Sequence, residues 1–463
     1  MIIIALLTKW KLKAVKPNAS NSIAPPQNSP IQSSFIQQRL NFCYTRTILK
    51  KRDDLMLMSN AATTKISPLL PLTAQQQQLI TTIQTFIANH LTDNQPAVFT
   101  IYGDAGTGKS VVLSHLFNNL QTAARTDSTA SVYQTTNYFL VNHPEVLKVY
   151  RNIAGEQPHL FKKDFQRPTT LINQLKKGQT TADVLVIDEA HLLLSQPDHY
   201  NNFYEQNQLT ALLQYAQVIV LVFDETQVLR MKSFWTEARL EQLLVPYTTA
   251  SYRLSQQFRM TASTELITWI NQLTQQHLTP LPKNAGQNYD LRIYDDAEAM
   301  HQAIVRRNQE VGLSRIVATS GYPSTLDGGK HYVTEGQFKL PWDQYNYTST
   351  PWAEIPKTIA EVGSIYTCQG FDLNYVGLIL GPPIQLAPDR QQLQIDLTKY
   401  TDVEAFKRRV DLTDPQAIEQ IEKQMILNSV NVLMKRGIHG LYIYAHDPQL
   451  RHYLIEHANG HVY

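Results

Sequence analysis

Residues 103 to 110 combine glycines, a lysine and a serine at a spacing that can hold a polyphosphate. The segment reads Gly-Asp-Ala-Gly-Thr-Gly-Lys-Ser, which is the P-loop pattern of a glycine, four free positions and Gly-Lys-Ser. Backbone N–H groups would wrap the phosphates, because glycines allow positive φ and close approach. The lysine would add positive charge near the β- and γ-phosphates, and the serine hydroxyl would bind Mg²⁺, which prefers oxygen ligands. The predicted site for ATP and Mg²⁺ therefore comprises Gly103, Asp104, Ala105, Gly106, Thr107, Gly108, Lys109 and Ser110.

Paired carboxylates follow the P-loop at the end of an apolar run. Residues 183–191 read Asp-Val-Leu-Val-Ile-Asp-Glu-Ala-His. Asp188 is placed to hold Mg²⁺, and Glu189 to act as general base for the water that attacks the γ-phosphate. His191 either couples to the next motif or simply packs. Downstream of a P-loop, this pair of acids predicts hydrolysis of ATP.

Two more polar side chains are candidates for contacts with the same phosphate. Gln227 ends an Asp-x-x-Gln pattern directly after the apolar run 218–223, and it could sense the γ-phosphate. Arg259 ends the segment 254–259, Leu-Ser-Gln-Gln-Phe-Arg. An arginine there could stabilise the charge that develops in the transition state.

Alternating strands and helices must position these side chains. Residues 97–102 form an apolar, β-branched run that predicts a buried strand, and 111–117 predicts the helix whose N-terminus faces the anion. The runs 183–188, 218–223 and 314–319 predict further strands. Because the carboxyl ends of parallel strands share one edge of a sheet, the ligand is expected at that edge. The expected fold class is α/β with mainly parallel sheets.

Composition limits the class of protein and its partners. The chain has 463 residues, of which 43% are hydrophobic and 17% charged, as in globular proteins. Two cysteines, Cys43 and Cys368, cannot form a disulfide framework, and a reducing cytoplasm is the expected location. No apolar run reaches the roughly 18 residues that span a bilayer, so no membrane is expected as a partner.

The N-terminal region differs in charge from the rest of the chain. Residues 1–52 hold nine Lys or Arg and no Asp or Glu, which leaves 32 basic against 39 acidic groups in the remainder. Any nucleic-acid site must therefore be a local basic groove. Residues 1–69 are expected to be a flexible leader, with translation starting at Met56 or Met58 as one explanation and an organellar transit peptide as the alternative.

The motifs, taken in order, resemble motifs I to IV of the superfamily-one DNA/RNA helicase core. The family's third motif is Gly-Asp-x-x-Gln, and Phe223 stands here for its glycine. Residues 364–376 are similar to the fifth motif through Gln369, Gly370 and Asp372. Residues 431–436 are similar to the sixth, with Arg436 as the arginine that reaches across the cleft. Leu-Thr-Ala-Gln-Gln, residues 72–76, resembles the adenine-recognition motif of helicases and would make Gln76 the base-reading residue; a plain helix start capped by Thr73 is the alternative.

More narrowly, the chain resembles bacterial proteins of the Schlafen group-three-like helicase-domain family. The resemblance rests on the sequence segments 142–150, 363–375 and 436–442. It implies two RecA-like P-loop lobes, residues 70–255 and 256–463, which sandwich Mg-ATP. The first lobe would supply Lys109, Glu189 and Gln227, and the second Arg436, with Arg259 near the junction.

The resemblance implies ATP hydrolysis coupled to binding and translocation or unwinding of single-stranded DNA or RNA. The alternative is a switch or sensor ATPase whose lobe closure signals to a protein partner. Residues 321–361 are expected to form an insertion in the second lobe. This segment contains an aromatic cluster of Trp342, Tyr345, Tyr347 and Trp352. Those rings form either a small core or a platform on which bases stack.

Overall fold

The P-loop strand lies inside a sheet of six parallel strands, in the order β3-β2-β4-β5-β1-β6. The computed structural model describes residues 62–463 except 255–258, 324–328, 345–347, 349 and 369–370. The strands of this first sheet are β1 (Ala97–Gly103), β2 (Asn137–Val141), β3 (Phe165–Gln166), β4 (Ala182–Asp188), β5 (Ala216–Phe223) and β6 (Thr248–Leu254).

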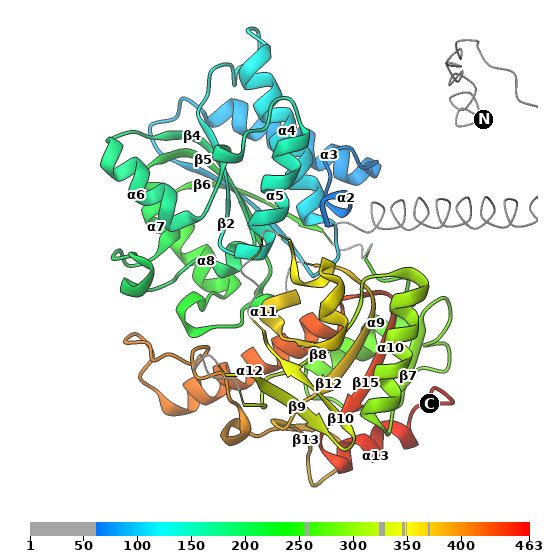
Figure 1. The fold of residues 1–463 in the computed structure, drawn as a ribbon. Helices are drawn as coiled ribbons and strands as arrows, with labels where there is room; N and C mark the ends of the chain where they lie inside the picture. Colours follow the sequence, from blue (N-terminus) through cyan, green and yellow to red (C-terminus); the bar gives the residue numbers. More distant parts are fainter. Residues whose placement is uncertain (1–61, 255–258, 324–328, 345–347, 349, 369–370) are drawn as a thin grey trace, which may run out of the picture. The chain divides into compact units, whose positions relative to one another are not determined.

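Helices cover both faces of the first sheet (Figure 1). Successive side chains of a strand point to opposite faces. Accordingly, Phe99 and Ile101 of β1 join one apolar core, while Val98 and Tyr102 join the other. The first core includes helices α3 (Ala74–His90), α4 (Lys109–Thr126) and α5 (Pro144–Glu156), and the second includes α6 (Pro168–Gly178), α7 (Gln208–Leu213) and α8 (Glu237–Leu244).

A second sheet of seven strands has the order β7-β15-β12-β8-β11-β10-β9. All neighbours are parallel except the hairpin of β9 and β10. The strands are β7 (Asp290–Ile293), β8 (Ser314–Ala318), β9 (His331–Glu335), β10 (Phe338–Trp342), β11 (Val362–Gly363), β12 (Leu373–Leu380) and β15 (Gly437–Ala445). A separate antiparallel pair consists of β13 (Ile384–Leu386) and β14 (Leu393–Ile395).

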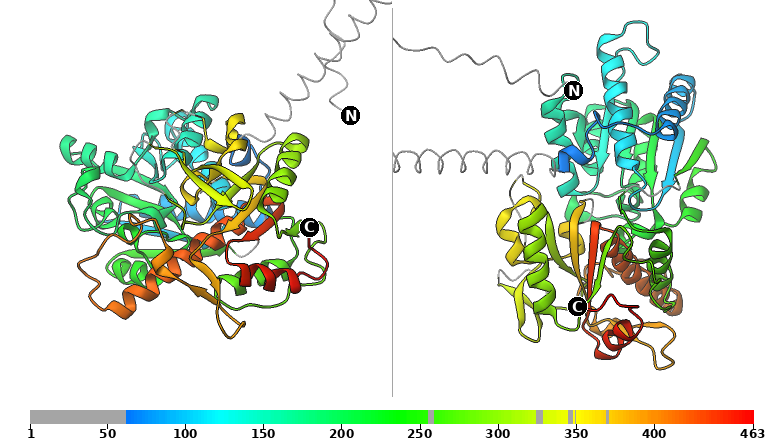
Figure 2. Two further views of the ribbon diagram at one scale, coloured as in Figure 1. Left: turned by 60° about the horizontal axis from the view of Figure 1, so that its bottom comes forward. Right: turned by 90° about the vertical axis from the view of Figure 1, so that its right-hand side faces the viewer.

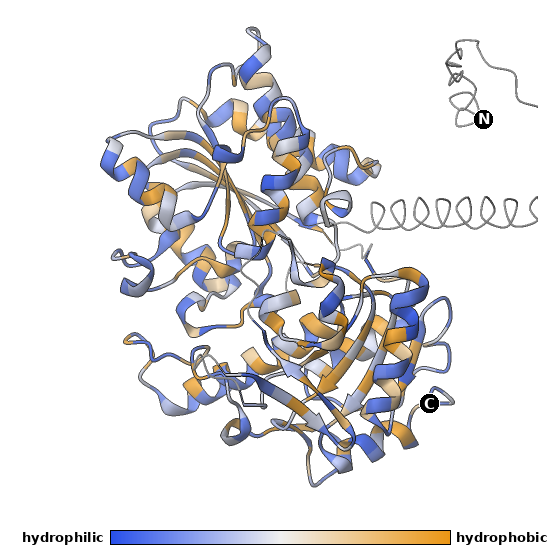
Figure 3. Ribbon diagram, viewed as in Figure 1, coloured by the Kyte–Doolittle hydropathy of each residue, from blue (hydrophilic) through white to orange (hydrophobic). Residues whose placement is uncertain are grey.

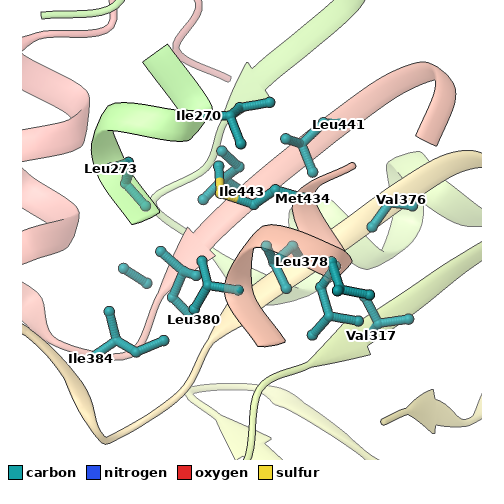
Figure 4. Packing of buried hydrophobic residues seen from close by; sticks show 14 of the residues in the cluster. Ile270, Leu273, Val317, Val376, Leu378, Leu380, Ile384, Met434, Leu441 and Ile443 are labelled. Carbon is teal, nitrogen blue, oxygen red and sulfur yellow. The ribbon is translucent and has the colours of Figure 1, made fainter. Parts of the chain in front are cut away.

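The second sheet is also buried on both faces, and two further views show its helices (Figure 2). One face packs on α9 (Thr264–Thr274), α12 (Pro415–Met434) and α13 (Pro448–Glu456), and the other on α10 (Ala297–Val311). Figure 4 shows Ile270 and Leu273 of α9 packed near Leu441 and Ile443 of β15. Apolar residues are concentrated along the strands of both sheets (Figure 3), as a doubly covered parallel sheet requires.

Short helices complete the part of the chain that the structure describes. Two are α-helical turns, α2 (Ala62–Lys65) and α11 (Ile365–Cys368). The remainder are 3-10 helices: η2 (Lys162–Asp164), η3 (Ala190–Leu192), η4 (His199–Asn201), η5 (Glu225–Gln227), η6 (Met231–Ser233), η7 (Trp352–Glu354), η8 (Pro356–Ala360) and η9 (Leu397–Lys399). Among the described residues, no helix is long and apolar enough to cross a membrane.

The predicted fold class is confirmed, since the chain is α/β with mainly parallel sheets. The expected leader lies almost wholly outside the described residues, and so does the junction expected at residues 255 and 256. Within 321–361, β9 and β10 extend the second sheet. Trp342 and Trp352 are buried in its apolar cores, which favours a core role over base stacking, while Tyr345 and Tyr347 lie outside the described residues.

Candidate nucleotide site

The P-loop turns from β1 into α4 through backbone conformations that favour glycine. Gly106 and Gly108 have φ of 86° and 80°. A Cβ added to Gly103 would lie 2.9 Å from both the Leu254 oxygen and Thr107 Oγ1. These positions therefore hold the loop in a tight curve that a larger residue would strain.

Lys109 is buried at the first position of α4, with its ammonium group folded back under the loop. Nζ donates to the carbonyl oxygens of Gly103 at 2.5 Å and Asp104 at 2.7 Å, and it lies 3.3 Å from Asp224 Oδ2. The two carbonyls belong to the loop itself, so the lysine stabilises the loop conformation. Its charge lies where a phosphate held by the loop would meet it.

Asp188 ends β4 as a buried carboxylate whose two oxygens each accept a hydrogen bond. Oδ1 accepts from the Glu189 N–H at 3.0 Å, and Oδ2 accepts from the Tyr150 hydroxyl at 2.6 Å. Burial, followed by repulsion from Glu189, raises the pKa of Asp188 to about 6. The Ser110 hydroxyl interacts with both Asp188 and Tyr150.

This group of oxygens fits a magnesium ion. Mg²⁺ is typically bound by one or two carboxylate or hydroxyl oxygens, with water and substrate phosphates completing its six ligands. The Asp188 carboxylate and the Ser110 hydroxyl come from neighbouring elements, β4 and α4, and they meet beside the loop. They are therefore the residues that would hold the ion.

Glu189 follows Asp188 with a left-handed backbone, φ 53°, which directs it away from the path of the strand. Its Oε2 lies 3.2 Å from His191 Nε2. Burial lowers the pKa of His191 to about 4, so the imidazole is neutral near pH 7. Burial also raises the pKa of Glu189, against the opposing effect of Lys109. A carboxylate with a raised pKa is a better general base than an exposed one.

Gln227 and Arg436 connect the two sheets. The Gln227 amide donates to Asp224 Oδ2 at 2.6 Å, and its Oε1 accepts from Arg436 Nη2 at 3.4 Å. Arg436 lies between α12 and β15 and donates through Nη1 to the Phe371 oxygen at 3.3 Å. Arg436 is 1% exposed, and burial, followed by repulsion from Arg259, lowers its pKa to about 10. It therefore remains charged near pH 7.

Arg259 and Lys65 converge on Asp372. Arg259 Nε lies 2.5 Å from Asp372 Oδ1, and the Lys65 ammonium donates to the Asp372 backbone oxygen at 3.1 Å. The pKa of Asp372 is lowered although burial opposes the shift, because Arg259 and then Lys65 favour the carboxylate. This cluster brings α2 to the same place as residues from both sheets.

These groups surround one cavity of about 190 Å³. Its charged lining consists of four cations, Lys65, Lys109, Arg259 and Arg436, and two carboxylates, Glu189 and Asp372. Positive charge therefore exceeds negative charge in the lining, which favours binding of an anion. The remaining lining residues are Ile66, Ala105, Gly106, Gly108, Ser110, Val111, Val146, Val149, Gln227 and Phe371.

The predicted site residues divide into those that line this cavity and those that do not. Most of the P-loop lines it, together with Glu189, Gln227, Arg259 and Arg436. Gly103, Asp104, Thr107 and Asp188 are outside the lining but belong to the same loop or contact it. Gly370 lies outside the described residues.

Gln76 is away from the cavity lining and takes part in a helix cap. Its Oε1 accepts from the Thr73 N–H at 3.0 Å, and its own N–H donates to Thr73 Oγ1 at 3.2 Å. This reciprocal pair is a capping box at the start of α3. The contacts are those of the plain helix start, and the base-reading role stays a prediction.

Sequence reasoning missed two residues of the site. Lys65 precedes the P-loop by about forty residues, and nothing in its surroundings marks it as a cation for the cavity. Tyr150 belongs to the segment 142–150 on which the family resemblance rests, but that resemblance did not assign a role to the tyrosine. Pairing of β2 with β4, which aligns Val141 with Asp188, brings α5 to the acidic strand end.

Comparison with known families places the chain among helicase domains. Residues 96–447 match the family model "Schlafen group 3, DNA/RNA helicase domain". The chain belongs to this family. The match begins directly before β1 and ends directly after β15, so it spans both sheets.

Relatives and solved structures with similarity to the chain include a yeast protein and two helicases. "Uncharacterized protein YPL245W" of Saccharomyces cerevisiae is 38% identical over 428 residues, covering 86% of this chain and 93% of that protein. The Pif1 helicase from Candida albicans is 13% identical, with a TM-score of 0.32 and coverage of 81% of this chain and 95% of its own. A Pif1 helicase from Bacteroides, solved with ADP-AlF3 and ssDNA, is 12% identical, with a TM-score of 0.30 and coverage of 80% and 92%. At these TM-scores neither helicase structure carries an argument about this chain.

Proposed function

We propose that this member of the Schlafen group 3 helicase-domain family hydrolyses ATP in the cavity between its two sheets. The observation that carries the proposal is that one cavity is lined by the P-loop, by Glu189 and Gln227 after strands of the first sheet, and by Arg436 beside the second. Residues 70–255 and 256–463 would act as two lobes that close on the nucleotide.

The P-loop side would bind the triphosphate. Backbone N–H groups of the loop would donate hydrogen bonds to the phosphate oxygens, and Lys109 would exchange its contacts with the Gly103 and Asp104 carbonyls for the β- and γ-phosphates. Mg²⁺, held by Asp188 and Ser110, would supply charge neutralisation for the phosphates. Glu189 would take the proton of the attacking water, a role that suits a buried carboxylate.

The opposite side of the cavity would stabilise the transition state. Charge spreads over the γ-phosphoryl oxygens during transfer, and a guanidinium already fixed in a dry site gains most from that charge. Arg436 meets this requirement because it is buried and its two described hydrogen bonds, at 3.3 and 3.4 Å, are long. Arg259 would act beside it. Gln227, which contacts Asp224 in the first lobe and Arg436 in the second, would couple the presence of the γ-phosphate to both lobes.

Family membership supports coupling of hydrolysis to single-stranded DNA or RNA. A nucleotide held from both sides favours the closed arrangement of the lobes, and its hydrolysis removes the contacts that favour closure. Repeated closure and opening would move a bound strand, with separation of a duplex as one consequence.

Steady-state ATP hydrolysis with and without nucleic acid tests the proposal. We expect Mg²⁺-dependent turnover that single-stranded DNA or RNA stimulates, with stimulation falling as salt rises because phosphate contacts release counterions. Several DNA and RNA oligonucleotides are compared at each salt concentration. Absence of ATP hydrolysis under all these conditions would contradict the ATPase proposal.

The second candidate is a switch or sensor ATPase that signals to a protein partner. After residue 52 the chain has 32 basic and 39 acidic groups, so its net charge is negative. This favours the second candidate, because a negative net charge does not attract nucleic acid. Mg²⁺-dependent turnover that no oligonucleotide changes, at low as well as at high salt, would select this candidate.

A further inference from the structure

Tyr150 makes a short hydrogen bond to the carboxylate that would hold magnesium. Its hydroxyl donates to Asp188 Oδ2 at 2.6 Å, while the Glu189 N–H occupies Oδ1 at 3.0 Å. Each carboxylate oxygen can accept in two directions, so these two bonds leave the carboxylate able to bind an ion or its water. The two bonds fix the plane of the Asp188 carboxylate before any ion binds.

The phenol that makes this bond is itself held in place. Tyr150 is 1% exposed, and its ring stacks on Phe165 with centroids 6.0 Å apart and an interplanar angle of 12°. Its centroid lies 4.4 Å from that of Phe139. These rings come from β2, β3 and α5 of one apolar core, so the position of the hydroxyl is set by packing.

The Tyr150 hydroxyl also interacts with the Ser110 hydroxyl, which in turn interacts with Asp188. Three oxygens from α4, α5 and β4 thus meet at one point.

We propose that Tyr150 is a positioning residue that orients Asp188, together with Ser110, toward the Mg²⁺ of Mg-ATP. The inference rests on the proposed ATPase function and names a residue that the sequence motifs do not include. Outer partners of metal ligands fix ligand orientation, and their loss typically lowers metal affinity about 10- to 100-fold. Phenylalanine at this position would fill the same space without the hydrogen bond.

The test measures the magnesium requirement of nucleotide binding in the full-length protein. Binding of a fluorescent ADP is followed by anisotropy during a Mg²⁺ titration and in excess EDTA, for wild type and Tyr150→Phe. We expect the Mg²⁺ concentration for half-maximal enhancement to rise about tenfold or more in Tyr150→Phe, with the affinity in EDTA within about twofold of wild type. An unchanged Mg²⁺ requirement overturns the proposal, and so does an equal loss of affinity with and without Mg²⁺.

A matched control and a double variant separate the proposal from a general packing defect. The Tyr322 hydroxyl donates to Glu335 Oε1 at 2.7 Å, and this tyrosine is also buried, but it lies in one of the apolar cores of the second sheet. Tyr322→Phe should leave the Mg²⁺ requirement unchanged. In an Asp188→Asn background, Tyr150→Phe should add little, because the carboxylate it orients is gone; an additive loss contradicts the proposal.

The same titration keeps this inference distinct from the proposed function. A wild type that binds nucleotide equally well with and without Mg²⁺ overturns the role of Tyr150 and leaves nucleotide binding intact. A wild type that binds no nucleotide in either condition overturns both.

Discussion

Replacement of Arg436 tests whether the second sheet takes part in the chemistry. In the structure the guanidinium donates to the Phe371 oxygen and to Gln227 Oε1 at 3.3 and 3.4 Å. Hydrogen bonds to charged groups contribute about 1.5–3 kcal/mol each, and these two are long, so exchanging them for phosphate contacts costs little. Arginines that reach the transferred phosphoryl group contribute about 10³–10⁵ in kcat, which is about 4–7 kcal/mol.

We therefore expect Arg436→Gln to lower kcat by at least about 10³-fold. Ground-state affinity for ATP should fall by less than about tenfold, because the P-loop contacts remain. Single-turnover hydrolysis, together with equilibrium binding of a fluorescent ATP analogue, separates the two effects. Thermal unfolding of the same samples checks that the variant is folded.

Arg409 offers a matched control for this variant. It is also buried, and it donates to Ser195 Oγ and to the Met231 oxygen, both at 2.6 Å, without lining the cavity. Arg409→Gln should cost stability and leave kcat within about threefold of wild type, since it removes no phosphate contact. If Arg436→Gln keeps kcat within about tenfold of wild type while folded, the arginine does not act on the phosphate.

Two further variants probe the site, and a third tests a buried histidine outside the cavity lining. Glu189→Gln should retain ATP binding but lower turnover by at least about 100-fold, because the general base is lost; a near-normal single-turnover rate would show that another group takes the proton. Lys65→Ala should weaken ATP binding, measured by fluorescence titration, because it removes one of four cations in the cavity; unchanged affinity would remove Lys65 from the site. His143 caps α5 by accepting from the Val146 N–H at 3.4 Å, and burial, then Arg230, lowers its pKa to about 3. The pKa of folded His143 lies below the ordinary 6.5, so the neutral imidazole stabilises the folded chain fully above about pH 6.5. As the pH falls from 6.5 toward 3, the free energy of unfolding decreases by about 1.4 kcal/mol per pH unit. His143→Asn keeps a capping acceptor without a proton to gain, so thermal unfolding near pH 7 and near pH 5 should show wild type losing more stability than the variant; an equal loss would refute this assignment.

The sequence could predict which residues meet where their positions follow from local spacing. The P-loop, Asp188 and Glu189 each follow a strand of the same parallel sheet, and parallel strands carry their carboxyl ends to one edge. Their meeting therefore follows from the period of the apolar runs and the order of the motifs. The burial of Trp342 and Trp352 could also be predicted from the sequence, because aromatic rings are more often buried in a core than used to stack on bases.

Contacts between distant elements were beyond that reasoning. Tyr150 meets Asp188 because β2 lies beside β4, and strand order cannot be read from a single pattern of apolar residues. Lys65 reaches Asp372 across 307 positions of the chain, through a short helix with no chemical motif. The family resemblance implied that Arg436 reaches across the cleft, but its contact with Gln227 was not predicted, since it joins two sheets across 209 positions.

A crystal structure of the chain with Mg²⁺ and a transition-state analogue of ATP would test the central claim most directly. The account predicts that the γ-phosphate mimic lies within hydrogen-bond distance of Lys109 Nζ on one side and of the Arg436 guanidinium on the other. A triphosphate bound to the P-loop alone, with Arg436 still bonded to Gln227 and Phe371, would contradict it.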